Sequence, residues 1–237
     1  MKLIEITNLT KKFNNITAVN DLSLTIRQGE TLGLVGESGS GKSTLSRLIL
    51  KLIEPDSGRI EYQGIKEMRR ECQIVFQDPQ NSLNPRIRVG EAIGEPILIH
   101  SLLPKNKIAG RVGDLLELVR LPASYAGRFP NELSGGERQR VGIARALAGE
   151  AKFLILDEPV SALDLFVQVE ILKLLRDLKT RLELTYLFIA HDLSVISYLS
   201  DRVAVMKEGR IIELGQKDEV LIHPRETYTK KLLAATL

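Results

Sequence analysis

The feature that most constrains how this chain folds is a change of hydrophobic period near residue 41. Residues 31–35 form an apolar run bounded by Gly29 and Gly36, which is typical of a buried central strand. Apolar residues then recur at helical spacing until Pro55 and Gly58; they are Leu45, Leu48, Ile49, Leu52 and Ile53. A glycine-rich loop therefore joins a predicted strand to a predicted helix.

This loop fits the phosphate-binding pattern G-x-x-x-x-G-K-[ST]. Glycines let the backbone curl with its N–H groups inward, and the following helix presents its positive N-terminal end to an anion. Lys42 is expected to reach the β- and γ-phosphates, and Ser43 to offer a hydroxyl to Mg²⁺. The alternative is a Gly/Ser turn with an exposed lysine, but the strand before and helix after favour a phosphate loop. The predicted phosphate-loop residues are Gly36, Ser38, Gly39, Ser40, Gly41, Lys42, Ser43 and Thr44.

Composition narrows the class of protein further. With 237 residues, 43% of them hydrophobic, the chain suits one large domain or one domain with an insertion. Its net charge of +3 is small and its charges are interspersed, so no nucleic-acid partner is expected. The single cysteine excludes an internal disulfide and a cysteine-rich metal site. Neither a signal peptide nor a membrane-spanning stretch is recognisable, so a pore would need another chain.

Further apolar runs alternate with helical patterns along the chain. The runs cover residues 74–76, 153–156, 185–190 and 203–206, and strands are also expected at 3–7 and 22–26. Residues from about 84 to 147 are richer in helical pattern, interrupted by Pro122 and Pro130. This alternation predicts an α/β fold with a mostly parallel sheet, whose catalytic groups lie at the carboxyl ends of the strands.

An acid pair ends one of these strands. Asp157 and Glu158 follow the apolar run 153–156, and adjacent residues of a strand face opposite ways. We therefore expect two different roles. Asp157 would hold Mg²⁺, usually through water, and Glu158 would orient and deprotonate an attacking water. Alone, such a pair is more often a helix cap or a solvated loop, and its position after a phosphate loop gives it weight.

A second anion site is predicted where Leu133-Ser134-Gly135-Gly136-Glu137 opens a helix with small residues. One nucleotide does not need two such sites from one chain. The economical explanation is that this helix serves a nucleotide held by a second subunit.

With this motif the sequence resembles the ABC transporter ATPases over essentially its whole length. The ordered motifs are residues 36–44 (Walker A), Gln77 (Q-loop), 133–137 (signature), 153–158 (Walker B), 161–164 (D-loop) and His191 (switch). The resemblance implies a P-loop NTPase fold with a mostly parallel core sheet, an N-terminal antiparallel β subdomain and an inserted helical subdomain. It implies one ABC ATPase domain over 1–237, with 1–30 and about 58–65 as the β part, about 84–147 as the helical insertion, and a RecA-like remainder.

The resemblance also implies roles for single residues. Two cassettes would enclose ATP between the Walker A loop of one and the signature of the other, so Ser134, Gly135 and Gly136 would bind nucleotide in trans. Gln77 would sense Mg²⁺ and the attacking water, and His191 would contact the γ-phosphate. Asp164 of the D-loop is a further expected nucleotide contact. Phe13 is the candidate for stacking on adenine, although it could equally be a core residue.

Several segments are similar to the peptide/nickel importer branch, among them Phe76-Gln77-Asp78-Pro79 and the late His223-Pro224 and Tyr228-Thr229. The branch implies ATP-driven import of di- or oligopeptides or a related solute such as nickel. It also implies a second ATPase subunit, either a paralogue that forms a heteromeric pair with this chain or an identical copy. Two transmembrane permease subunits, an extracytoplasmic solute-binding protein and a peripheral position on the cytoplasmic face of the membrane are implied as well. Rival readings are a soluble ABC ATPase, a regulatory cassette and a P-loop kinase. The intact catalytic set and the signature argue against the last two.

Overall fold

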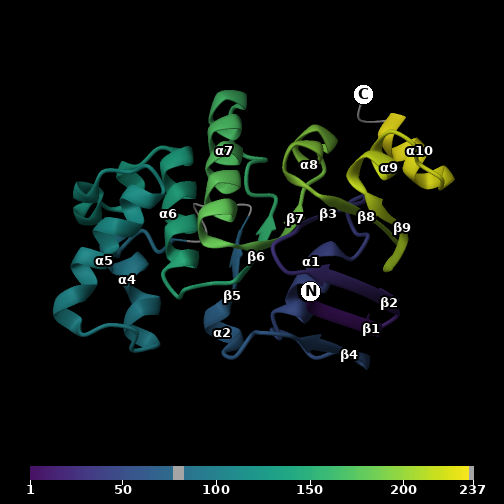
Figure 1. Ribbon diagram of the computed structural model, residues 1–237, viewed down its shortest axis with the longest axis horizontal. Coiled ribbons are helices and arrows are strands. Elements are labelled where there is room, and N and C mark those ends of the chain that lie inside the picture. Colours follow the sequence, from purple (N-terminus) through teal and green to yellow (C-terminus); the bar gives the residue numbers. More distant parts are fainter. Residues whose placement is uncertain (77–82, 235–237) are drawn as a thin grey trace. The chain divides into compact units, whose positions relative to one another are not determined.

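A computed structural model of the chain describes residues 1–76 and 83–234 (Figure 1). The chain divides into two units: the first combines Met1–Lys66 with Leu182–Leu237, and the second is Glu67–Arg181. The phosphate loop lies in the first unit, whereas the acid pair and the signature lie in the second.

Three strands of the first unit form an antiparallel sheet in the order β2-β1-β4. They are β1 (Lys2–Phe13), β2 (Ile16–Arg27) and β4 (Ser57–Tyr62). Ile4 of the central strand lies opposite Ile26 on one side and Tyr62 on the other. The turn between β1 and β2 contains Asn14 at φ 50°, a left-handed conformation that asparagine tolerates better than most residues.

Four strands of the same unit pair in the order β7-β3-β8-β9. They are β7 (Thr185–Ile189), β3 (Thr31–Val35), β8 (Arg202–Lys207) and β9 (Arg210–Gln216). The first three run parallel, and β9 runs antiparallel to β8. Every residue of β3 and β7 is buried, as expected of central parallel strands with near-continuous apolar sequence.

Four helices accompany these strands: α1 (Lys42–Ile49), α8 (Leu193–Leu199), α9 (Lys217–Leu221) and α10 (Thr227–Ala234). The predicted helix after Gly41 ends at Ile49, earlier than its periodicity suggested, and Leu52 is 56% exposed. A buried ion pair joins the starts of β3 and β8, where Arg202 donates to both carboxylate oxygens of Glu30 at 3.1 and 3.2 Å. This pair helps fix the strand that leads into the phosphate loop.

In the second unit, β5 (Cys72–Val75) and β6 (Phe153–Asp157) pair in parallel, with Cys72 opposite Phe153. Helices occupy most of the described sequence between them and the stretch after β6. They are α4 (Val89–Ile99), α5 (Lys105–Leu118), η1 (Ala123–Gly127), η2 (Pro130–Glu132), α6 (Gly135–Leu147) and α7 (Leu165–Leu182). A further short helix, α2 (Met68–Glu71), directly precedes β5. Within residues 84–147, where a helical insertion is expected, the structure has α4, α5, α6 and the short 3₁₀ helices η1 and η2.

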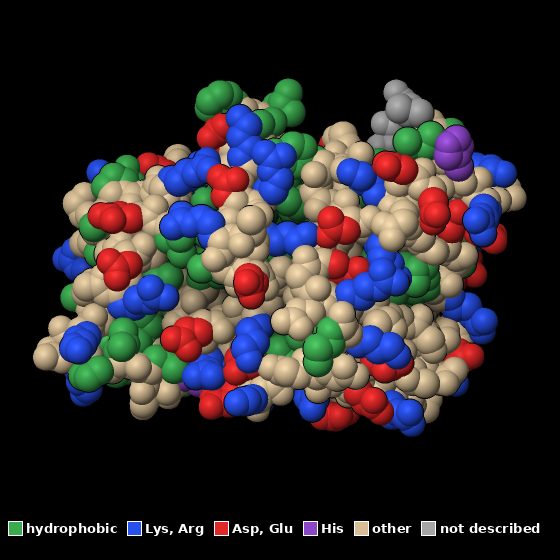
Figure 2. Space-filling model, viewed as in Figure 1, with side chains coloured by type: hydrophobic (Ala, Val, Ile, Leu, Met, Phe, Trp, Pro, Cys, Tyr) green, Lys and Arg blue, Asp and Glu red, His purple; other side chains and the backbone are tan. Residues whose placement is uncertain are grey.

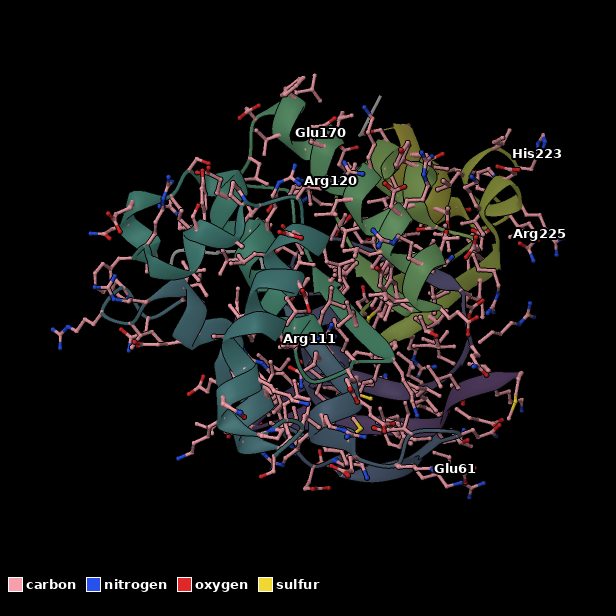
Figure 3. All side chains as sticks on the ribbon, turned by 60° about the vertical axis from the view of Figure 1, so that its left-hand side comes forward. Glu61, Arg111, Arg120, Glu170, His223 and Arg225 are labelled. Carbon is pink, nitrogen blue, oxygen red and sulfur yellow. The ribbon has the colours of Figure 1, made fainter. Side chains whose placement is uncertain are left out.

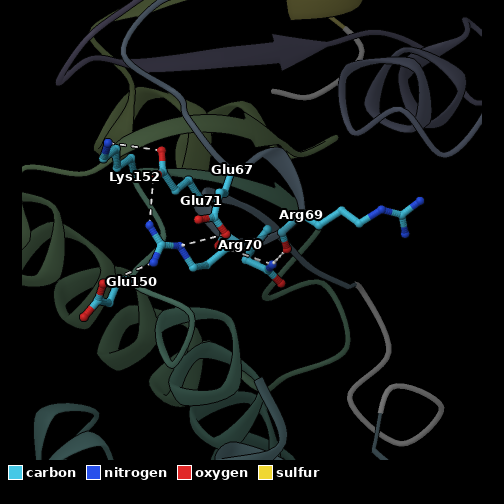
Figure 4. Close-up of polar contacts among 7 residues, drawn as sticks. Glu67, Arg69, Arg70, Glu71, Glu150 and Lys152 are labelled. Atoms are coloured by element: carbon cyan, nitrogen blue, oxygen red, sulfur yellow. Dashed lines mark hydrogen bonds and ion pairs between the residues drawn. The ribbon is translucent and has the colours of Figure 1, made fainter. Parts of the chain in front are cut away.

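A charged network fixes the start of the strand that carries the acid pair (Figure 4). The Glu71 carboxylate, 2% exposed, pairs with the side chains of Arg70 and Lys152 at 3.1 Å each. The Glu71 backbone carbonyl accepts the Lys152 backbone N–H at 2.8 Å. Because a buried carboxylate is costly unless it is paired and hydrogen-bonded, these contacts hold the α2–β5 junction against the residue that precedes β6.

The predicted fold class is confirmed: parallel strands alternate with helices, an antiparallel sheet forms at the N-terminus, and a helical stretch lies between β5 and β6. Among the helices of residues 1–76 and 83–234, none combines the length and the apolar character needed to cross a bilayer.

Candidate functional site

The phosphate-loop residues follow β3 directly and end at the first turn of α1. The Lys42 ammonium donates to the carbonyl oxygens of Gly36 at 2.7 Å and Glu37 at 2.9 Å. Lys42 therefore lies over the loop, while Glu37, Ser38 and Gly39 are exposed at its crest and Ser40 is buried. Ser43 is exposed beside Lys42 on the first turn of the helix, so both predicted phosphate and Mg²⁺ ligands lie at one helix end.

The glycines of the loop serve two different needs. A Cβ on Gly36 would lie 2.2 Å from the Met206 carbonyl oxygen, and a Cβ on Gly41 would lie 2.2 Å from the Ala18 carbonyl oxygen. Gly39, at φ 79°, has open space instead. Besides letting the backbone curl, as expected from the sequence, Gly36 and Gly41 therefore let neighbouring backbone approach the loop.

Phe13 ends β1 and is 45% exposed, so it is not a core residue. The Lys11 ammonium lies 5.6 Å from the centre of its ring and pairs with Asp56 at 2.9 Å. Hydrogen bonds from Lys11 and the Lys12 backbone hold the pKa of Asp56 below its ordinary value. An exposed ring at the end of a strand has a face available for stacking on a base.

His191 follows β7 and lies exposed just before α8. The next residue, Asp192, caps that helix: its carboxylate accepts from the Ser194 N–H at 2.8 Å and the Ser194 hydroxyl at 2.6 Å. The Ser194 hydrogen bond is the main cause of a lowered Asp192 pKa. The cap fixes where the helix begins, and with it the position of the neighbouring histidine.

In the second unit, the acid pair straddles the end of β6. Asp157 is the last residue of the strand, whereas Glu158 has φ 48° and lies outside it. Strand alternation was therefore the wrong reason to separate the two carboxylates, since the chain changes direction between them. The Glu158 carbonyl accepts from the Ser161 N–H at 3.3 Å and the Ser161 hydroxyl at 3.2 Å, which joins the acid to the start of the D-loop.

The signature begins α6 with a reciprocal cap. The Ser134 hydroxyl accepts the Glu137 N–H at 3.3 Å, and the Glu137 carboxylate accepts the Ser134 N–H at 2.8 Å. The Tyr125 hydroxyl donates to the other Glu137 oxygen at 2.8 Å. The Ser134 backbone hydrogen bond is the largest cause of a lowered Glu137 pKa. The Ser-x-x-Glu spacing could have revealed Glu137 as a site residue from sequence.

The signature and the D-loop lie side by side. A Cβ on Gly136 would lie 2.4 Å from Val167 of α7, and a Cβ on Gly135 would lie 3.3 Å from Leu163. Asp164 caps α7 by accepting the Val167 N–H at 3.1 Å. Leu165 and Phe166 follow, each 77% exposed, and hydrophobic side chains gather over one end of α7 in Figure 2.

Arg120, two residues after α5, ties the end of that helix to α7. Arg120 pairs with Asp177 and, at 3.8 Å, with Glu170, both of which lie on α7. Figure 3 labels Arg120 next to Glu170. The second unit therefore brings together the acid pair, the signature and the D-loop, whereas the first holds the phosphate loop, Phe13 and His191. Gln77 lies outside the described residues.

Comparison with known proteins adds to this geometry. The ABC transporter family model matches residues 19–161. The oligopeptide transport ATP-binding protein OppF of Streptococcus mutans is 47% identical over 99% of this chain and 81% of its own length. The dipeptide transport ATP-binding protein DppF of Lactococcus lactis subsp. cremoris is 46% identical, again over 99% of this chain and 81% of its own length.

Solved structures agree with the sequence relatives. Clostridium perfringens cbiO1, part of the ABC transporter complex cbiONQ, matches with a TM-score of 0.85 and 31% identity over 94% of this chain and 91% of its own. A dimeric ATP-binding cassette in a post-hydrolysis state with ADP and Pi matches with a TM-score of 0.79 and 29% identity, over 91% and 99%. The chain therefore belongs to the ABC transporter family, among its ATP-hydrolysing cassettes.

Proposed function

We propose that this chain powers the import of oligopeptides or dipeptides by hydrolysing ATP beneath a membrane permease. The observation that carries the proposal is its near-full-length similarity to peptide transport ATP-binding proteins. The local geometry supports the chemistry, because a lysine, a hydroxyl and a curled backbone gather at one helix N-terminus.

ATP is held, in this proposal, by the phosphate loop, with Lys42 on the β- and γ-phosphates and Phe13 against the adenine. The residue types expected to hold Mg²⁺ supply hydroxyl, amide and carboxylate oxygens, which this ion prefers. Ser43, Asp157 and Gln77 would hold the ion, which neutralises charge on the phosphates when bound.

Glu158 orients the attacking water and accepts its proton. His191 contacts the γ-phosphate. Ser134, Gly135 and Gly136 act on the nucleotide of a second cassette, and Asp164 contributes from the D-loop. Two observations support action in trans: the N–H groups of Gly135 and Gly136 have no hydrogen-bond acceptor among the described residues, and the adjoining Leu165 and Phe166 are exposed.

A groove between α4 and α5 supports docking of a permease. Its volume is about 620 Å³, and its lining is mostly apolar. The apolar and glycine positions are Gly90, Gly94, Leu98, Ile108, Ala109, Val112 and Ala126, and the charged lining residues are Arg88, Glu91, Glu95 and Lys105. An amphipathic helix at the inner end of a permease subunit fits such a groove. Two permease subunits, a solute-binding protein outside the membrane and a peripheral position on its cytoplasmic face complete the proposal.

Glu158→Gln tests the central claim. Loss of a general base should lower ATP turnover by about 10²–10⁴-fold and stop uptake of a labelled oligopeptide, with ATP binding retained. The matched variant Lys42→Ala should lose ATP binding itself. Turnover near that of the unaltered protein in Glu158→Gln would remove Glu158 from its role, and normal ATP binding by Lys42→Ala would overturn the phosphate-loop assignment.

A further inference from the structure

The outer side of the phosphate loop contacts the β8–β9 hairpin. Residues Glu208 and Gly209 form its turn, both with positive φ, as in the two-residue turns that suit twisted strands. Gly209 donates its N–H to the Ser40 carbonyl at 2.9 Å and accepts the Asn20 N–H at 2.9 Å. One short turn thus joins the buried part of the phosphate loop to β2.

A side chain from α10 reaches the exposed part of the same loop. The Tyr228 hydroxyl accepts the Glu37 N–H at 3.3 Å. The Lys207 ammonium, at the end of β8, lies 5.0 Å from the centre of the Tyr228 ring. The half-buried ring is thereby held between the hairpin and the loop.

Independent contacts fix the helix that carries this tyrosine. The Glu213 carboxylate on β9 accepts the N–H groups of Arg225 and Glu226, at 2.8 and 3.2 Å, just before α10 begins. Figure 3 shows Arg225 on this segment, near His223. Thr229, next to the tyrosine, is 1% exposed and anchors the helix in the unit. Tyr228 is therefore presented from a fixed support.

Acidic groups face the phenol. Burial is the largest cause of a raised Tyr228 pKa, and the charges of Glu37 and Glu208 raise it further, while the Glu37 N–H opposes them. The phenol therefore keeps its proton at neutral pH. Its hydroxyl is a neutral hydrogen-bonding group beside the loop.

Glu37 links this contact to the chemistry. Its N–H bonds Tyr228, while its carbonyl oxygen accepts from the Lys42 ammonium at 2.9 Å and the Ser40 N–H at 3.2 Å. A rotation of the backbone at Glu37 would displace the lysine and the loop crest together. We propose that Tyr228 is a positioning residue, whose hydroxyl holds the Glu37 backbone so that the phosphate loop is set for ATP. This inference rests on the phosphate-loop assignment under Proposed function.

Tyr228→Phe removes the hydroxyl and keeps the ring against Lys207. Losing one hydrogen bond should weaken equilibrium binding of a fluorescent ATP analogue about three- to tenfold and raise KM for ATP by a similar factor. At saturating ATP, kcat should change less than about twofold, because the nucleotide then orders the loop itself. Amide hydrogen exchange across residues 36–41 should become faster in nucleotide-free protein.

Tyr198→Phe, a change of the same kind on α8, is the control and should leave ATP-analogue binding, KM, kcat and amide exchange unaltered. Unchanged ATP affinity in Tyr228→Phe, or a fall confined to kcat, would overturn the inference. A lower melting temperature with unchanged affinity and exchange would overturn it too, because the tyrosine would then be merely structural. Lys42→Ala separates the two proposals: if it loses ATP binding while Tyr228→Phe does not, only the positioning role fails.

Discussion

Two glycine-rich segments open helices in this chain, and each does so by different means. At the start of α1, Gly41 occupies the N-cap position at φ 108° and no side chain caps the helix. At the start of α6, Ser134 and Glu137 cap each other through side chains. Neighbouring backbone and Lys42 shape the first segment, whereas the second is capped by its own side chains.

This difference in capping matches the functions proposed for the two segments. A loop that wraps around phosphates needs an unusual backbone path, which close contacts with Ala18 and Met206 enforce from outside. A helix end that meets a nucleotide from a second chain needs only a regular helix with accessible N–H groups, which a local cap supplies. Three sets of substitutions test this contrast.

Gly41→Ala should have the largest effect. Its Cβ would lie 2.2 Å from the Ala18 oxygen, in a backbone conformation that alanine rarely adopts. Clash and strain together should lower ATP affinity at least about 100-fold, measured with a fluorescent ATP analogue. Gly39→Ala is the matched control: with no atom within 4 Å, it carries only left-handed strain and should lose less than about tenfold. Equal losses in both would show that outside contacts do not shape the loop.

Gly136→Ala should act on the second segment through packing. Its Cβ would lie 2.4 Å from a methyl group of Val167, so the Val167 side chain or the packing of α6 on α7 must shift, at a cost of about 1–3 kcal/mol in unfolding free energy. ATP turnover should fall while ATP binding at the phosphate loop persists. Adding Val167→Ala should restore part of both losses. Gly142→Ala, with open space on the same helix, should be neutral or stabilising by up to ~1 kcal/mol. A harmless Gly136→Ala would contradict the packing account.

Glu137→Gln should have the smallest effect and a defined pH dependence. The amide can keep the hydrogen bond to Ser134, so the change removes mainly a charge at a helix N-terminus, worth about 0.3–1 kcal/mol. Because the folded-state pKa of Glu137 is below its ordinary value of 4.5, its stabilisation is complete above that pH and is lost as pH falls through the lowered pKa. Denaturant unfolding should therefore show a difference at pH 7 that vanishes in acid. A difference that persists in strong acid would exclude the charge as its cause.

Sequence patterns predicted some parts of the molecule well. The strand Thr31–Val35 has the bounds expected of it, because a buried parallel strand needs apolar residues on both faces. By contrast, β9 was not predicted: its residues are half-buried or exposed, so its hydrophobic pattern is weak. The helix after Gly41 was predicted too long, since apolar residues continue at helical spacing beyond Ile49, where the helix ends.

The candidate site likewise has features that the sequence predicted and features that it did not. Motif spacing identified the phosphate loop and the signature as helix starts, because those features are local in sequence. The left-handed backbone at Glu158 and the approach of Met206 to Gly36 were not predictable, since each depends on how distant segments pack. The roles assigned to single site residues stay predictions, for Lys42 and Glu158 as much as for His191, Phe13 and Gln77.

The contact of Tyr228 with the phosphate loop has a practical consequence. The chain contains five tyrosines and no tryptophan, so tyrosine fluorescence is not quenched by energy transfer to tryptophan. A phenol that accepts a backbone hydrogen bond from Glu37 and lies beside the Lys207 ammonium senses the arrangement of both in its fluorescence. The difference in tyrosine emission between the protein and Tyr228→Phe thereby isolates an intrinsic optical probe at the edge of the nucleotide site, with no label required.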